Sequence, residues 1–336
     1  MTFSEKTIMS RIVQVSFILV LILAVSIFAG LAVGSSFNGL KTLWEIVFSA
    51  KKPDPVLSTI IWRIRFPRVL MALMSGAVLS TGGLVFQALL RNPLAEPYIL
   101  GISGGSAIGA IIGIILGISR FPGVAAAAFT GSMATLVLVV VMSSGKASLT
   151  KDSMLLSGVV INAFCSAIIM FLISITDNSQ IHSIMFWLMG DLSSSDMNQV
   201  HFLALSIIPC FFVIFLFSHS MNLLLMGKEM AHSMGVNIKF VTGILLVVSS
   251  FMVSATVADC GLLGFVGLVV PHIMRLVFGP DHRILVPACI LGGGAYMIIC
   301  DLLARWIPQQ GEIPVGVITA MIGAPIFIFL LKKGKT

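Results

Sequence analysis

Long apolar runs alternate with short polar segments along almost the whole chain. Ten of these runs reach the length of about 20 residues that a helix needs to cross the hydrocarbon core of a bilayer. They cover residues 12–34, 69–90, 99–118, 122–142, 154–175, 200–218, 240–258, 261–278, 284–300 and 315–331. Backbone polar groups must be paired inside lipid, and the runs are too long and too uniformly apolar for barrel strands. The pattern therefore predicts an all-α, polytopic membrane protein.

The composition supports the same fold class. Hydrophobic residues make up 58% of the 336 residues and charged residues 10%, with a mean hydropathy of +1.09. So little polar surface excludes a soluble globular protein and favours a lipid environment, with no nucleic-acid partner. The first run is longer than the apolar core of a signal peptide, and no A-x-A site follows it, so we expect a retained span. Residues 1–336 are expected to form a single transmembrane domain.

Ten spans would place both termini on one side of the membrane. Basic residues near both ends, including Arg11 and Lys332, predict that this side is the cytoplasm. On the outer side, Arg63, Arg65 and Arg68 are grouped before the second span. Such a local group of outer cations indicates an acidic partner, although arginines reaching toward the membrane interface would give the same pattern.

Glycines recur at every fourth residue of the third run. Four residues advance a helix by about 400°, so these glycines form a stripe where a neighbouring helix can approach closely. The stripe, which predicts helix packing, comprises Gly101, Gly105, Gly109, Gly113 and Gly117.

The same run contains a G-x-S-x-G pattern around Ser103. A nucleophile elbow needs a strand before its helix, and an all-apolar helical segment does not supply one. An intramembrane serine protease, with Ser103 as nucleophile and His201 or His272 as base, remains an alternative function.

The sequence indicates no metal or nucleotide chemistry. The five cysteines lie within or at the edge of apolar runs, without C-x-x-C pairs or histidines at metal-ligand spacing, which is typical of small core residues. The phosphate-binding pattern G-x-x-x-x-G-K-[ST] does not occur. We therefore expect no catalytic residue, metal or cofactor in this chain, and we expect it not to be an enzyme.

A series of motifs occurs in a fixed order along nearly the whole chain. They are RFPR at 65–68, QALLRNPLAEP at 87–97, LGISGG at 100–105, GFVGLVVPHIMR at 264–275, DHR at 281–283 and EIPVG at 312–316. Together they resemble the FecCD family of bacterial ABC importer permeases. The resemblance implies a homodimer with ten helices per subunit and an extracytoplasmic substrate-binding protein. It also implies two separate ATPase subunits on the cytoplasmic face, which would bind ATP and magnesium.

The resemblance gives the outer cations a partner. Arg65, Arg68 and Arg305 match arginines with which the family's vitamin B12 permease pairs with acidic residues of its binding protein. A permease dimer would present these arginines twice, once to each lobe of a two-lobed protein. Arg63 lies outside the matched motif.

The resemblance also assigns three regions deeper in the chain. The positions that match the family's cytoplasmic gate are Asn92 and Leu94. Those that match its pathway-lining helix are Ser157, Gly158, Asn162 and Ser166, although hydrogen bonding between helices would explain these residues too. Those that match its ATPase-coupling segment are Gly227, Lys228, Glu229, Ala231 and Gly235.

These features predict a permease in the bacterial inner membrane that moves a metal chelate inward by ATP-driven alternating access. We expect a ferric siderophore as cargo, with haem or cobalamin as alternatives. An ion-coupled secondary transporter is a function of another class, and it requires an ionisable residue in the middle of a span. The nearest candidates, Asp259 and Asp301, both lie at the outer end of a run.

Overall fold

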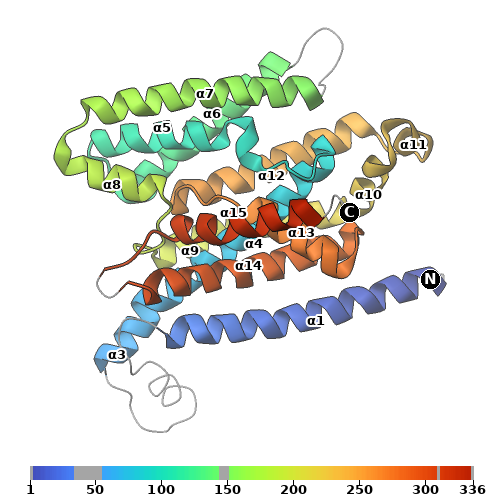
Figure 1. The fold of residues 1–336 in the computed structure, drawn as a ribbon, viewed down its shortest axis with the longest axis horizontal. Helices are drawn as coiled ribbons and strands as arrows, with labels where there is room; N and C mark the ends of the chain where they lie inside the picture. The colour runs from blue at the N-terminus through green and yellow to red at the C-terminus, as the bar shows by residue number, and fades with distance from the viewer. Residues whose placement is uncertain (1–2, 34–54, 144–150, 309–310, 334–336) are drawn as a thin grey trace.

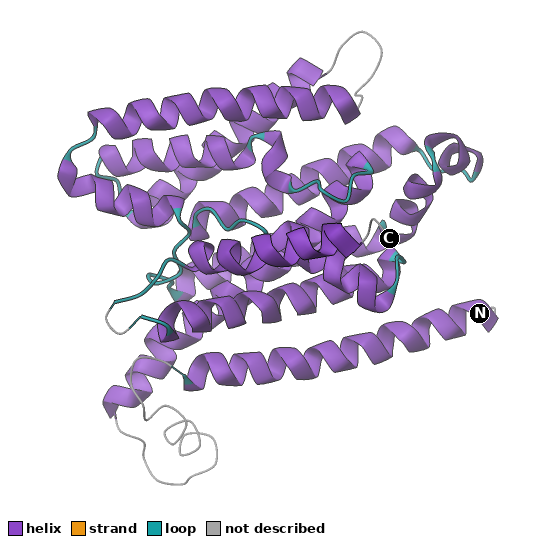
Figure 2. Ribbon diagram, viewed as in Figure 1, coloured by secondary structure: helices purple, strands orange, loops and turns teal. Residues whose placement is uncertain are grey.

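The computed structural model describes residues 3–33, 55–143, 151–308 and 311–333, and the regular structure in these ranges is helical (Figures 1 and 2). The predicted all-α fold class is confirmed. Each of the ten apolar runs corresponds to one helix: α1 (Phe3–Ala32), α4 (Phe66–Leu90), α5 (Ile102–Ile115), α6 (Ala125–Ser143), α7 (Lys151–Ile175), α9 (Met197–Leu216), α12 (Ile238–Cys260), α13 (Val266–Phe278), α14 (His282–Trp306) and α15 (Val315–Lys333). Seven of these regions are long and apolar enough to cross a membrane, whereas α5, α13 and the apolar part of α15 are shorter.

Shorter elements lie at the ends of the bundle. They are α3 (Pro55–Thr59), η1 (Ile60–Arg65), η2 (Pro97–Leu100), η3 (Arg120–Val124), α8 (Asn178–Leu188), α10 (Ser218–Met226) and α11 (Lys228–Ser233). The start of α1, the end of α15 and α11 lie at one end of the molecule, and α3 and α8 lie at the other (Figure 1). We call these the inner and outer ends, following the predicted orientation. Both ends of the described chain thus lie together, as ten crossings require, and their cytoplasmic location stays a prediction.

The helix α4 forms the centre of the bundle and is 89% buried over its most apolar window. It packs against α14, α12 and α13. A Cβ atom at Gly76 would overlap the carbonyl oxygen of Gly293 on α14, and one at Gly83 would overlap that of Gly267 on α13. Helices in lipid associate through such close packing because the surrounding acyl chains are as apolar as the helices.

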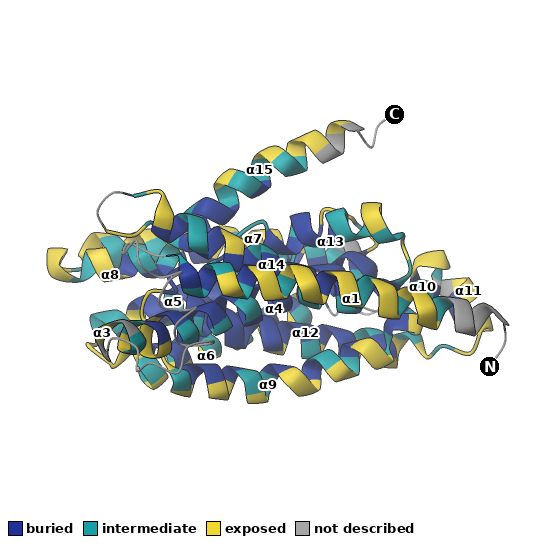
Figure 3. Ribbon diagram, turned by 90° about the horizontal axis from the view of Figure 1, so that it is seen from below, coloured by how far each residue is buried: buried dark blue, intermediate teal, exposed yellow. Residues whose placement is uncertain are grey.

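The helix α1 is at the opposite extreme, with only 11% of its apolar window buried. It lies along α14 at the edge of the bundle, and Figure 3 shows exposed residues over much of its length. Its large apolar side chains, such as Phe17 and Val25, are exposed on the helix surface. This exposure is typical of a helix whose outer face contacts lipid.

The glycine stripe lies where α5 meets α6. A Cβ at Gly105 would overlap the carbonyl oxygen of Gly131, and one at Gly109 would overlap that of Ala127. Gly113 faces η3, where an added Cβ atom would lie 3.3 Å from the Cα atom of Val124. The remaining two glycines lie just outside α5, at its two ends: Gly101 and Gly117 have φ values of 80° and 67°, a conformation that favours glycine.

We predict that Gly109→Ala lowers the stability of the permease by about 1–3 kcal/mol, because the added methyl group must separate α5 from α6. The control is Gly243→Ala on α12, where a Cβ atom meets nothing within 4 Å. Thermal unfolding of the purified chain in detergent measures both variants. Equal melting temperatures for the two would contradict the close packing of α5 on α6.

Candidate functional site

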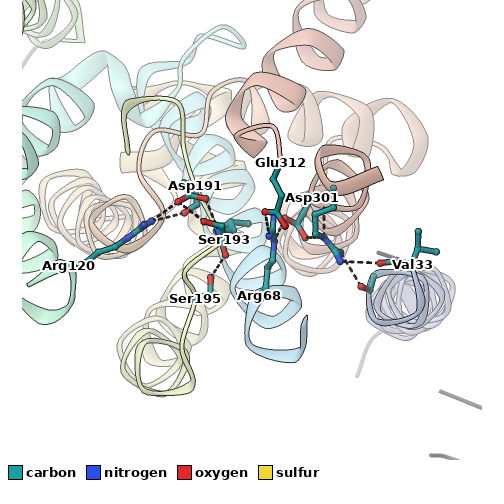
Figure 4. A network of polar contacts seen from close by, with 11 residues as sticks. Val33, Arg68, Arg120, Asp191, Ser193, Ser195, Asp301 and Glu312 are labelled. Atoms are coloured by element: carbon teal, nitrogen blue, oxygen red, sulfur yellow. Dashed lines mark hydrogen bonds and ion pairs between the residues drawn. The ribbon is translucent and has the colours of Figure 1, made fainter. Parts of the chain in front are cut away.

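Three predicted docking residues belong to one group of charges at the outer end. Arg68 Nε lies 2.7 Å from Asp301 Oδ1, and its Nη1 lies 2.5 Å from Glu312 Oε2. Arg305 Nε lies 3.0 Å from the other oxygen, Asp301 Oδ2 (Figure 4). We call these residues, with Arg65, the outer ion-pair cluster. Asp301 is fully buried. A buried charge is unfavourable unless it is paired, and two arginines compensate the charge of Asp301.

The cluster also holds the end of α1. Arg65 Nη1 donates hydrogen bonds to the carbonyl oxygens of Leu31 and Ala32, at 2.9 and 3.1 Å. Arg305 donates to those of Gly30 and Val33, at 3.0 and 3.1 Å. The last carbonyl groups of a helix have no partner within it and carry partial negative charge, which cations stabilise. The two arginines therefore attach the exposed helix α1 to the central helices.

The three docking arginines are accordingly buried, at 4% to 8% exposure. The side chain of Glu312 is the exception in the cluster, because 43% of it is exposed. Arg63, whose role the sequence leaves open, is exposed. An acidic partner that approaches the described surface thus meets Glu312 before Arg68, and the docking role of the arginines stays a prediction.

Sequence reasoning found these arginines but not their internal partners. The spacing of Asp301 and Arg305, four residues apart on one helix, does signal an ion pair. Glu312 lies 244 residues from Arg68 in sequence, and carbonyl groups carry no side-chain signal, so neither contact is readable from a local pattern.

A second polar group lies at the outer end beside the first (Figure 4). Arg120 Nη2 lies 3.0 Å from Asp191 Oδ2, and the backbone N–H of Ser193 donates to Asp191 Oδ1 at 2.8 Å. Burial disfavours the charged form of Asp191, but the hydrogen bonds from Ser193 and the charge of Arg120 outweigh it and keep its pKa below the ordinary value. A cavity of about 470 Å³ opens beside this group, and it is lined by residues that include Ile114, Ile118, His182, Phe186 and Trp187.

The predicted gate residues lie in the loop between α4 and η2. The helix α4 ends at Arg91, which has a positive φ of 47°. Asn92 Oδ1 then accepts a hydrogen bond from the backbone N–H of Leu94 at 2.9 Å, which fixes a tight turn. The side chain of Leu94 is exposed at the inner end. This loop has a defined shape, and its gating role is not tested by that shape.

The predicted pathway residues lie on α7, largely on the side that faces the same chain. Asn162 Nδ2 donates to the carbonyl oxygen of Tyr98 in η2 at 2.9 Å. A Cβ at Gly158 would overlap the carbonyl oxygen of Ile99, and Ser157 is buried. Ser166 is exposed and donates to its own helix. In the single chain, Asn162 therefore makes a hydrogen bond between two helical segments, and pathway lining remains a hypothesis.

The predicted coupling segment is a break between two helices at the inner end. Gly227, with φ 126° and ψ 151°, ends α10, and α11 begins at the next residue. Ala231 is fully buried, Glu229 is exposed, and Gly235 has a positive φ of 82° after α11. The side chain of Lys228 lies outside the described residues.

Three methionines that the motif comparison did not select are exposed on this segment and just before it. Met226, Met230 and Met234 follow one another at intervals of four residues and are 64%, 48% and 57% exposed. Methionine side chains adapt to irregular apolar surfaces and are frequent at protein contact sites. Their regular spacing in a short polar region between two spans is the feature of the sequence that could have identified them as a contact surface.

Ser103 has no catalytic surroundings in the described chain. It lies at the inner start of α5, whereas His201 lies at the outer start of α9. Nδ1 of His272, the other candidate base, has no hydrogen-bond partner among the described residues. The same residues contain no group of three or more His, Cys, Asp or Glu side chains placed to hold a metal ion.

Comparisons with known proteins agree over nearly the whole chain. A model of the FecCD transport family matches residues 21–333. The vitamin B12 import system permease protein BtuC of Salmonella typhimurium is 37% identical over 273 residues, which cover 81% of this chain and 83% of that protein. BtuC of Escherichia coli O9:H4 is 37% identical over 275 residues, which cover 82% of this chain and 84% of that protein.

Solved structures give the same result. A metal-chelate type ABC transporter in an inward-facing conformation has a TM-score of 0.85 and 32% identity, and the match covers 95% of this chain and 99% of that chain. PsaBC from Streptococcus pneumoniae in complex with Fab has a TM-score of 0.56 and 17% identity, over 78% of this chain and 89% of that chain, which shows a shared fold alone. Because the family model and the BtuC relatives both match most of its length, this chain belongs to the FecCD transport family and is a multi-pass permease subunit of the ABC importer type.

Proposed function

We propose that this permease forms a homodimer in a bacterial inner membrane and imports a metal chelate by ATP-driven alternating access. The observation that carries the proposal is the match of 95% of the chain to a metal-chelate type ABC transporter. The BtuC relatives are named for the import of vitamin B12, itself a cobalt chelate. Cobalamin, a ferric siderophore and haem are the candidate cargoes, and a ferric siderophore was the expectation from the sequence.

The two ends of the bundle support two different partners. The outer ion-pair cluster contains three arginines and two carboxylates, so it keeps a net positive charge that suits an acidic binding protein. The exposed methionines at the inner end offer an apolar contact for an ATPase subunit. The outer site is formed by segments distant in sequence, whereas the inner site is one continuous segment.

An external ATPase also agrees with the distribution of charge. Asp301 is fully buried, but it lies in the outer part of α14 and is held by Arg68 and Arg305. A carboxylate fixed between two arginines is a poor proton carrier, because protonation would leave two buried cations uncompensated. Asp301 is therefore poorly suited to couple transport to a proton gradient.

Uptake into proteoliposomes tests the function and the cargo together. Vesicles contain the permease and its ATPase, with the binding protein outside, and receive labelled cyanocobalamin, ferrichrome or haemin. We expect uptake of one chelate that requires both ATP and the binding protein, since the sequence carries no phosphate-binding G-x-x-x-x-G-K-[ST] pattern of its own. Uptake of any of these chelates driven by an ion gradient without ATP would contradict the proposal.

Glu312→Gln tests the docking surface without removing a buried charge. Glu312 occupies Arg68 from the exposed side, so a carboxylate of the binding protein must displace it. A partly exposed ion pair contributes up to about 1 kcal/mol, so the variant should bind the binding protein about fivefold more tightly. The Kd for the binding protein is measured on the permease in nanodiscs.

The matched control is Asp177→Asn, which neutralises another exposed carboxylate at the outer end, before α8. The control should leave the Kd within about twofold of the wild-type value, because long-range effects of one exposed charge are screened by salt. An equal gain in both variants would mean that only net charge matters, and no gain at Glu312→Gln would remove Arg68 from the docking site.

A further inference from the structure

The inner end of α14 contacts α10, the helix that leads into the coupling segment, and Asn222 of α10 makes the polar part of this contact. Its Nδ2 donates a hydrogen bond to Asp281 Oδ1 at 2.8 Å. Its Oδ1 accepts a hydrogen bond from the backbone N–H of His282 at 2.9 Å and lies 2.8 Å from His282 Nδ1. An amide oxygen only accepts hydrogen bonds, so His282 Nδ1 carries the proton in this contact. One amide thus makes three contacts with the first turn of α14.

The contact lies in a setting that keeps it fixed. His282 is fully buried, Asn222 and Asp281 are half-buried, and the neighbours of Asn222 on α10, Met221, Leu223 and Leu224, are buried. Hydrogen bonds in such a place are hard to exchange for bonds to water. The position of α10 is therefore tied to the start of α14 by both polar and apolar contacts.

The carboxylate of Asp281 has two roles in this contact between α10 and α14. It accepts a hydrogen bond from the backbone N–H of Arg283 at 2.9 Å, which caps α14, and it lies 2.7 Å from Arg283 Nη2. Burial opposes its ionisation, but the hydrogen bonds and charge of Arg283, with the bond from Asn222, lower its pKa to about 2. The acceptor that Asn222 needs is thus charged at any physiological pH.

The joint, by which we mean the contact of Asn222 with Asp281 and His282, lies between the exposed methionines of the inner end and the outer end of the molecule. Asn222 is one helical turn before the exposed Met226, after which Gly227 leads into α11. On the other side, α14 runs for 25 residues, about 37 Å, to Trp306, and Asp301 and Arg305 lie near this outer end. One helix therefore contacts α10, next to the coupling segment, at its inner end and belongs to the outer ion-pair cluster at its other end.

We propose that Asn222 is a positioning residue that transmits movement of α10 and α11 to α14, and through α14 to the outer ion-pair cluster. This inference rests on the proposed function, in which an ATPase subunit moves the coupling segment. Asn222 binds neither nucleotide nor cargo in this role. It sets how much of the ATPase movement reaches the permease helices.

The test measures chelate imported per ATP hydrolysed in proteoliposomes that contain the whole complex. Asn222→Asp places a second carboxylate against Asp281, so it should break the joint and lower this ratio about tenfold. A loss of stability alone would reduce the number of working complexes, and it would lower uptake and hydrolysis together without changing the ratio. His219→Ala, an exposed position on the same helix, is the control and should keep the wild-type ratio.

The double variant Asn222→Asp with Asp281→Asn tests whether the two side chains act through their mutual contact. It exchanges the two groups, so that the amide at position 281 can donate to the carboxylate at position 222. Asparagine caps a helix about as well as aspartate, so α14 should begin as before. We expect the double variant to recover the ratio to within about twofold of the wild-type value.

The outcomes distinguish the two levels of the proposal. If the wild-type complex shows no ATP-dependent uptake, the proposed function is disproved, and the role of Asn222 falls with it. If the wild-type complex imports a chelate but Asn222→Asp keeps its ratio, or the exchange fails to restore it, the joint is disproved. Where Asn222→Asp does not assemble, Asn222→Ala removes the bonds without adding charge, and a wild-type ratio in that variant likewise disproves the joint.

Discussion

The close contact between α4 and α14 determines where most other helices of the permease lie. Gly76 and Gly293 bring the two backbones together, and Ser80 Oγ donates across the same interface to the carbonyl oxygen of Cys289 at 2.6 Å. Lipid provides no hydrophobic force that would hold two apolar helices together, so shape and interhelical hydrogen bonds must do so. The helices α12 and α13 pack against α4, and α1 packs against α14, whereas α5, α6 and α7 pack on one another and contact this group through α12.

The outer ion-pair cluster is possible because of where this pair ends. Burying an ion is expensive, and removing one partner of a buried pair leaves an uncompensated charge. Asp301 meets Arg68 only because α4 and α14 lie side by side with their outer ends aligned. The cluster in turn holds α1, whose own packing is slight, through four carbonyl groups at its end. A packing constraint at the centre thus supports a polar attachment at the edge.

The sequence predicted the spans well and their polar ends poorly. A run of about 20 apolar residues has few alternatives to a membrane helix, so each of the ten runs matches a helix. The run at 284–300 was predicted too short because Asp301 and Arg305 interrupt its apolar pattern, yet α14 continues to Trp306. For the same reason, the helical path into α4 begins in α3 and continues through η1, and does not begin at residue 69. Charges that find partners inside the protein look like loop residues in a one-dimensional pattern.

The candidate sites also contain residues that the sequence predicted and contacts that it did not predict. Local spacing located the glycines that pack on α6, and the family resemblance located the arginines of the outer end. The contact of Asn162 with Tyr98, and that of Asn222 with His282, join segments about 60 residues apart and depend on how the helices pack. Sequence reasoning therefore recognises a class of residue at such positions, and only the packed structure gives its partner.

Directional contacts along α14 have a mechanical consequence. Hydrogen bonds and ion pairs fix α14 to α10 at its inner end, and to α4 through Arg68 at its outer end and through Ser80 between them. Apolar contacts have no preferred direction, so packed helices can slide by small amounts where these alone join them. In the described ranges of α1 and α9, the exposed faces are free of such fixed points over most of their length. A displacement at the inner end should therefore move α4 and α14 as one rigid pair, while the outer helices yield around it.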